Sequence, residues 1–258
     1  MDEHSNKNTR PVWGEIAGRS YELSRKLISV MRAFCNSKRK GRKRLAEMSL
    51  VRRVQCNLTA ITYLADLCYK KDSLYFKIPV GLLTRSCLMD SIYALYLHAL
   101  SAKEAEEEIE VFNKGYVKSL EERFDVYKDK VAHVGFSEEL TRDFYDLGRE
   151  DIFMRYLTFE KEGEELKTKV VRSKELRTVH KSWPENMTIA RMVEHVQTKP
   201  KMSAVVTRLN AYYKYFSQYE HFSEQGFGDS LAPFGDDNVS FPAAIDALEK
   251  GIRLVVKI

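Results

Sequence analysis

The chain is poor in the residues that form tight turns and covalent cross-links. Its 258 residues include 12 glycines, 6 prolines and 4 cysteines. A sandwich of many short strands needs more turn residues than this, so the composition argues against an all-β architecture. No two cysteines have the spacing of a zinc knuckle or a redox motif. We therefore expect four buried thiols in a reducing compartment and no disulfide framework.

Several kinds of catalytic motif are also missing from the sequence. A phosphate-binding glycine loop and a Gly-x-Ser-x-Gly nucleophile elbow do not occur. No histidine follows a glutamate at the Glu-x-x-His spacing that carboxylate-bridged metal bundles use. The sequence therefore predicts no metal and no cofactor.

No segment has the composition of a signal peptide or a membrane span. The amino terminus, MDEHSNKNTR, is polar and has no apolar core. The apolar run at residues 78–102 contains Arg85 and Asp90 near its middle. Each of these charges costs about 2.5–3.5 kcal/mol at the centre of a bilayer. We expect a cytoplasmic protein without a membrane partner.

Apolar residues, 44% of the chain, recur at helical spacing over most of its length. They predict helices over residues 13–36, 45–70, 78–100, 102–134, 137–147, 187–196, 202–222 and 243–256. Ser240-Phe241-Pro242 is expected to cap the last of these helices. Residues 153–182 stay open, with a short strand or a loop as the alternatives. The expected fold class is all-α, an irregular bundle of about seven to eight helices with one core.

The pattern divides the chain into three expected segments. Residues 1–54 form a helical extension that carries a basic loop. Residues 55–225 form the helical core, and residues 226–258 form a loop and a carboxyl-terminal helix that packs on this core.

Positive charge is concentrated in one short stretch. The net charge is +5, and six basic residues fall within residues 38–44, so the remainder is close to neutral. Such a patch can bind phosphates, because each neutralised phosphate releases counterions, but it can equally be a solvated loop. The candidate contacts to a nucleic acid or an acidic protein partner are Lys38, Arg39, Lys40, Arg42, Lys43 and Arg44. The oligomeric state is left open.

Two apolar segments carry polar groups that a core must satisfy. Residues 82–100 include Arg85 and Asp90, and residues 211–222, AYYKYFSQYEHF, hold six aromatic residues and end beside His221. Buried charge is costly unless it is paired. We therefore expect the two helices to touch and to bring Arg85 or Asp90 near His221.

Ser217 and His221 are four residues apart, so they share one face of a helix. In a catalytic interpretation, His221 is the general base or acid, Ser217 orients it, and Arg85 stabilises an anion. In a structural interpretation, the same residues form a satisfied polar pair near a helix end. The neighbouring aromatic stripe can stack on bases or can belong to the core.

The order of these motifs resembles a known family. An Arg-Ser helix with aromatics is followed by a tryptophan, a short helix and a Tyr-rich helix ending in Ser-x-x-x-His. The matching residues are Arg85, Ser86, Tyr93, Tyr96, Trp183, Tyr213, Tyr215, Ser217 and His221. This pattern covers roughly residues 55–225 and resembles the bacterial domain-of-unknown-function family five-six-seven-seven.

One position departs from that family. Met89 stands where the family carries a glutamate one turn after the arginine. Asp90 lies about 140° around the helix from Arg85, so it cannot replace that glutamate on the same face. The family is loosely similar to the HEPN group of bacterial defence and toxin domains, some of which are RNases. Their diagnostic arginine, four to six residues before a histidine, is absent before His221.

Two functions follow from these observations as expectations. The first is a helical binding or regulatory module, and the resemblance implies a link to bacterial phage defence or nucleic-acid stress. The alternative is a metal-independent, HEPN-related RNase-like enzyme that uses His221, Ser217 and Arg85 as its catalytic residues.

Overall fold

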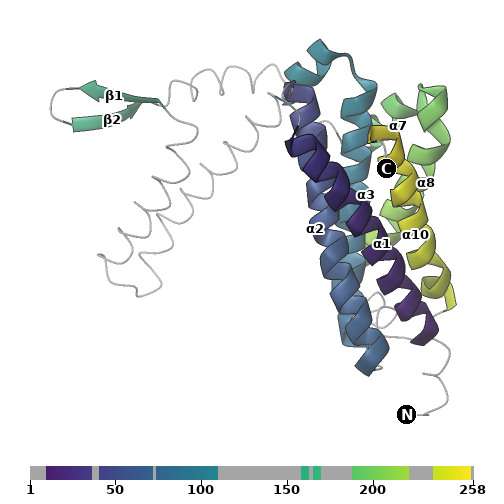
Figure 1. Ribbon diagram of the computed structural model, residues 1–258. Helices are drawn as coiled ribbons and strands as arrows, with labels where there is room; N and C mark the ends of the chain where they lie inside the picture. The colour runs from purple at the N-terminus through teal and green to yellow at the C-terminus, as the bar shows by residue number, and fades with distance from the viewer. Residues whose placement is uncertain are drawn as a thin grey trace. The chain divides into compact units, whose positions relative to one another are not determined.

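The computed structural model describes residues 10–36, 41–71, 74–109, 158–162, 165–169, 188–220 and 235–256. The chain divides into two compact units, of which one combines residues 1–106 with 187–258 and the other comprises residues 107–186. The first unit is an all-α multi-helix bundle, as the sequence predicts (Figure 1). In the second unit, β1 (Thr158–Glu162) and β2 (Glu165–Lys169) pair as an antiparallel hairpin. This hairpin lies in the segment that the sequence left open.

The bundle begins with three antiparallel helices, α1 (Arg10–Cys35), α2 (Arg42–Lys71) and α3 (Lys77–Ala99), as Figure 1 shows. A short 3-10 turn, η2 (Leu74–Phe76), precedes α3, and a helical segment at residues 102–109 follows it. The bundle is completed by α7 (Ile189–Gln197), α8 (Pro200–Phe216), the 3-10 turn η3 (Ser217–Tyr219) and α10 (Gly235–Val255). α3 is central, with α2 on one side and α8 on another (Figure 1).

The central position of α3 explains its composition. Its buried residues lie all around the helix, and a helix enclosed in this way is apolar on every face rather than along one stripe. The turn η3, which follows α8, packs closely on α3, as a Cβ added at Gly81 would lie 2.6 Å from the ring of Tyr219. α3 and α8 also contact each other, so the predicted contact between these two helices is confirmed.

The last helix begins earlier than the sequence predicts. α10 starts at Gly235, and Pro242 lies inside it instead of at its beginning. A proline within a helix removes one backbone hydrogen bond and crowds the preceding turn. Phe241 is buried, however, and its ring centroid lies 5.6 Å from that of Trp13 and 4.7 Å from that of Phe216. Burial of this aromatic cluster offsets the cost of the proline.

Other boundaries also differ from the sequence-based expectation. α8 ends at Phe216 and continues only as the turn η3, whereas the periodicity extends a helix to residue 222. The expected segment boundary between residues 54 and 55 falls inside α2. The helices expected after residue 109, up to residue 147, lie outside the described residues.

The cysteines are only partly as expected. None of the four forms a disulfide, and Cys68 and Cys87 are buried. Cys35 and Cys56 are exposed, so the expectation of four buried thiols is wrong for these two. Apolar neighbours in sequence do not bury a residue that helical rotation turns outward.

Candidate functional site

Arg85 joins α3 to the end of α8. Its Nε donates a hydrogen bond to Ser217 Oγ at 3.2 Å, and its Nη2 donates one to Tyr213 Oη at 3.0 Å. The same Nη2 lies 2.5 Å from Glu220 Oε2 in an ion pair. The guanidinium carbon lies 4.8 Å from the centroid of the Tyr213 ring, within cation–π range. These four residues are the Arg85 cluster.

The Arg85 cluster contains two of the three predicted catalytic residues. His221, the third, follows Glu220 in the chain and lies outside the described residues. Ser217 has one O–H, and it donates this group to the carbonyl oxygen of Tyr213 at 2.8 Å. Ser217 is therefore an acceptor toward any further partner. Glu220, which the sequence analysis did not single out, supplies the carboxylate for Arg85.

Asp90 lies apart from this cluster, on the side of α3 that faces α2. Its Oδ1 is 3.2 Å from Arg53 Nη2, and its side chain is 1% exposed. Its Oδ2 has no hydrogen-bond partner among the described residues. Burial raises the pKa of Asp90 to about 6, against the lowering effect of Arg53. The sequence predicts Arg85 or Asp90 near His221, which lies outside the described residues; Arg85 contacts Ser217, four residues before His221, whereas Asp90 contacts Arg53.

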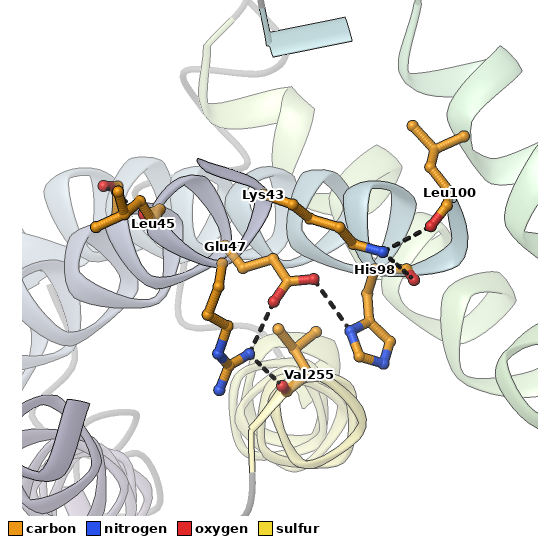
Figure 2. Close-up of polar contacts among 8 residues, drawn as sticks. Lys43, Leu45, Glu47, His98, Leu100 and Val255 are labelled. Atoms are coloured by element: carbon orange, nitrogen blue, oxygen red, sulfur yellow. Dashed lines mark hydrogen bonds and ion pairs between the residues drawn. The ribbon is translucent and has the colours of Figure 1, made fainter. Parts of the chain in front are cut away.

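A second polar cluster surrounds Glu47 near the start of α2 (Figure 2). The Glu47 carboxylate is 2% exposed, and both of its oxygens are bonded. Oε1 lies 3.1 Å from His98 Nδ1, and Oε2 accepts a hydrogen bond from Arg44 Nη1 at 2.8 Å. Burial raises the pKa of Glu47, but the hydrogen bonds from His98 and Arg44 outweigh it and hold the pKa below its usual value. Because an ionised carboxylate only accepts, the Nδ1 of His98 carries the proton.

Two cations of this cluster bind the carbonyl ends of other helices. Lys43 Nζ donates to the carbonyl oxygens of His98 at 3.1 Å and Leu100 at 2.6 Å, at the end of α3 (Figure 2). Arg44 Nη1 donates to the carbonyl oxygen of Val255 at 2.8 Å, at the end of α10. The last carbonyls of a helix carry partial negative charge and lack partners within the helix. We call Lys43, Arg44, Glu47 and His98 the Glu47 cluster.

The predicted basic contact residues thus divide into three groups. Lys38, Arg39 and Lys40 lie outside the described residues. Arg42 is exposed at the start of α2. Lys43 and Arg44 are half-buried and hold helix ends together, so the picture of a freely solvated cluster does not apply to these two.

Sequence reasoning missed two further arginines on the same helix. Arg52 and Arg53 are exposed on α2, three turns after Arg42. Arg42 and Arg53 are 11 residues apart, which places them about 20° from each other around the helix. The sequence shows this spacing, but the predicted contact residues came only from the basic run at residues 38–44. We define the outward face of α2 as its exposed residues between positions 42 and 63, which are Arg42, Leu45, Ser49, Arg52, Arg53, Cys56 and Tyr63.

The described residues hold neither a metal-binding group nor a membrane-spanning helix. Within the ranges given above, no group of three or more histidine, cysteine, aspartate or glutamate side chains is arranged to hold a metal ion. No helix in the described part of the chain is long and apolar enough to cross a membrane.

Comparisons of the chain with protein-family models, with curated proteins and with solved structures found no match. The resemblance to family five-six-seven-seven therefore stays a prediction.

Proposed function

We propose that this chain is a helical binding or regulatory module that takes an acidic partner through residues 38–42 and the exposed arginines of α2. The observation that carries the proposal is the charge distribution of α2, which has seven lysines and arginines and two carboxylates. Glu47 is buried, and Asp66 pairs with Lys70 at 2.6 Å. Among the described residues, the exposed Arg52 makes no ion pair, so its charge is available to an outside anion.

The partner is a nucleic acid or an acidic protein, because both present anions that an exposed guanidinium binds. The resemblance to family five-six-seven-seven adds a context, a bacterial cytoplasmic protein of phage defence or nucleic-acid stress. No cofactor is part of this proposal, and the oligomeric state is open.

Fluorescence anisotropy of a labelled oligonucleotide and of a labelled poly-glutamate peptide tests the proposal. The proposal predicts that at least one of them binds and that its affinity falls steeply between about 50 and 200 mM salt, as counterion release requires. Absence of binding by both probes at the lower salt concentration contradicts it.

A second candidate is a metal-independent, HEPN-related RNase-like enzyme using His221, Ser217 and Arg85. The favouring observation is the 3.2 Å hydrogen bond that joins Arg85 to Ser217. If His221 is a general base, His221→Ala lowers RNA cleavage by about 100-fold or more and leaves the unfolding curve unchanged. If His221 has a structural role, the variant loses about 1–3 kcal/mol of unfolding free energy, and the parent protein has no RNA cleavage to lose.

A further inference from the structure

The outward face of α2 places Arg52 and Tyr63 close to one line along the helix. Each helical residue advances about 100° and about 1.5 Å, so these two residues lie about 20° apart around the helix and about 16 Å apart along its axis. Arg42 lies about 80° around the helix from Arg52. Tyr63 is 70% exposed.

The electrostatics of this face are one-sided. Among the residues that the structure describes, Arg52 has no ion pair, and Glu47, the acid nearest to it in α2, is buried and bonded to His98 and Arg44. α3, which packs against α2, has Asp90 as its one acid, and this carboxylate is buried beneath Arg53. Arg53 is therefore partly compensated, while Arg52 is available to an outside anion.

We propose that the outward face of α2 binds a single strand of nucleic acid, with Arg52 on a phosphate and the Tyr63 ring stacked on a base. This inference rests on the proposed binding function and names its partner and surface. Guanidinium groups match phosphate geometry, and an exposed aromatic ring stacks on bases of any sequence. A duplex keeps its base faces stacked on one another, and an acidic protein offers no base, so neither would use Tyr63 in this way.

The test measures binding of a labelled oligothymidylate to the full-length chain over a series of salt concentrations. The variant Arg52→Gln removes one phosphate contact, so the slope of log affinity against log salt shrinks by about 0.7. The matched control, Arg208→Gln, removes one exposed charge from α8 and leaves affinity within about twofold. Tyr63→Ala weakens binding by about fivefold or more through lost stacking.

The outcomes separate the inference from the proposed function. If the parent protein binds neither oligothymidylate nor poly-glutamate, both fail. If oligothymidylate binds but the α2 and α8 variants weaken it equally, the surface assignment fails and the binding function stands. If Tyr63→Ala has no effect, if a duplex of the same length binds more tightly, or if poly-glutamate competes equally per charge, the single-strand assignment is overturned. Unchanged melting curves for Arg52→Gln and Tyr63→Ala show that a loss of binding does not come from unfolding.

Discussion

Cations on the same helix have opposite surroundings in this protein. Lys43 and Arg44 turn toward the ends of α3 and α10, where they bind carbonyl oxygens and a buried carboxylate. Arg42 and Arg52 lie on the outward face of α2, which also carries Tyr63. The difference arises because successive residues are rotated by about 100° around a helix. Arg42, Lys43 and Arg44, three of the six predicted contact residues, therefore do not share one environment.

Lys43 and Arg44, the inward cations of α2, also explain an unfavourable feature of this helix. Its first turn is basic and has no acidic residue, although a positive charge at a helix amino end opposes the helix dipole. α3 and α10 end beside this turn, and their terminal carbonyls are the groups that attract such charges. The contacts to two neighbouring helices offset the cost within α2.

Within the Glu47 cluster, replacement of Glu47 is expected to have the largest effect on the unfolding free energy. Glu47→Ala leaves Arg44 and His98 without their buried partner and lowers the unfolding free energy by about 3 kcal/mol. Because the pKa of Glu47 is lowered in the folded state, the stability it confers is present above its unfolded pKa and is lost as pH falls. Urea unfolding at pH 7 and at pH 4 measures both effects. A loss below about 0.5 kcal/mol at pH 7 contradicts a structural role.

Replacement of Asp90, which lies beneath Arg53, is expected to change the unfolding free energy less and in the opposite direction. The folded pKa of Asp90 is raised from 3.8 to about 6, so folding takes up a proton between these values and stability falls as pH rises through them. Asp90→Asn removes this buried charge and raises the unfolding free energy at pH 8 by about 2 kcal/mol. The variant also loses the pH-dependent fall between about pH 4 and pH 7. A variant less stable than the parent at pH 8 shows instead that the pair with Arg53 stabilises the fold.

Periodicity in the sequence was sufficient for the helices among the described residues and for one long-range contact. The apolar runs around Arg85 and Ser217 predict two buried helices, and their polar groups predict that the helices meet. That contact is confirmed by the hydrogen bond between these side chains. The HEPN-related and defence-related expectations have no such support, because they depend on a resemblance and on His221.

The Glu47 cluster could not be predicted in this way. Glu47 and His98 are 51 residues apart, and Arg44 and Val255 are 211 residues apart. The packing of the whole bundle determines which helix ends lie beside the start of α2. No local sequence pattern therefore predicts these contacts. The prediction that Pro242 stands at the beginning of the last helix was wrong for a related reason. Pro242 lies inside α10, because burial of Phe241 in the assembled core outweighs a local helix-start signal.

The division of α2 into inward and outward cations is tested most directly by two single substitutions measured side by side. Lys43→Gln is predicted to lower the unfolding free energy by about 1 kcal/mol, because two carbonyls lose their donor, and to leave oligothymidylate affinity within about twofold. Arg52→Gln is predicted to leave stability within about 0.5 kcal/mol and to reduce the salt slope of binding by about 0.7. An equal loss of oligothymidylate affinity in both variants, with stability unchanged, would contradict the account.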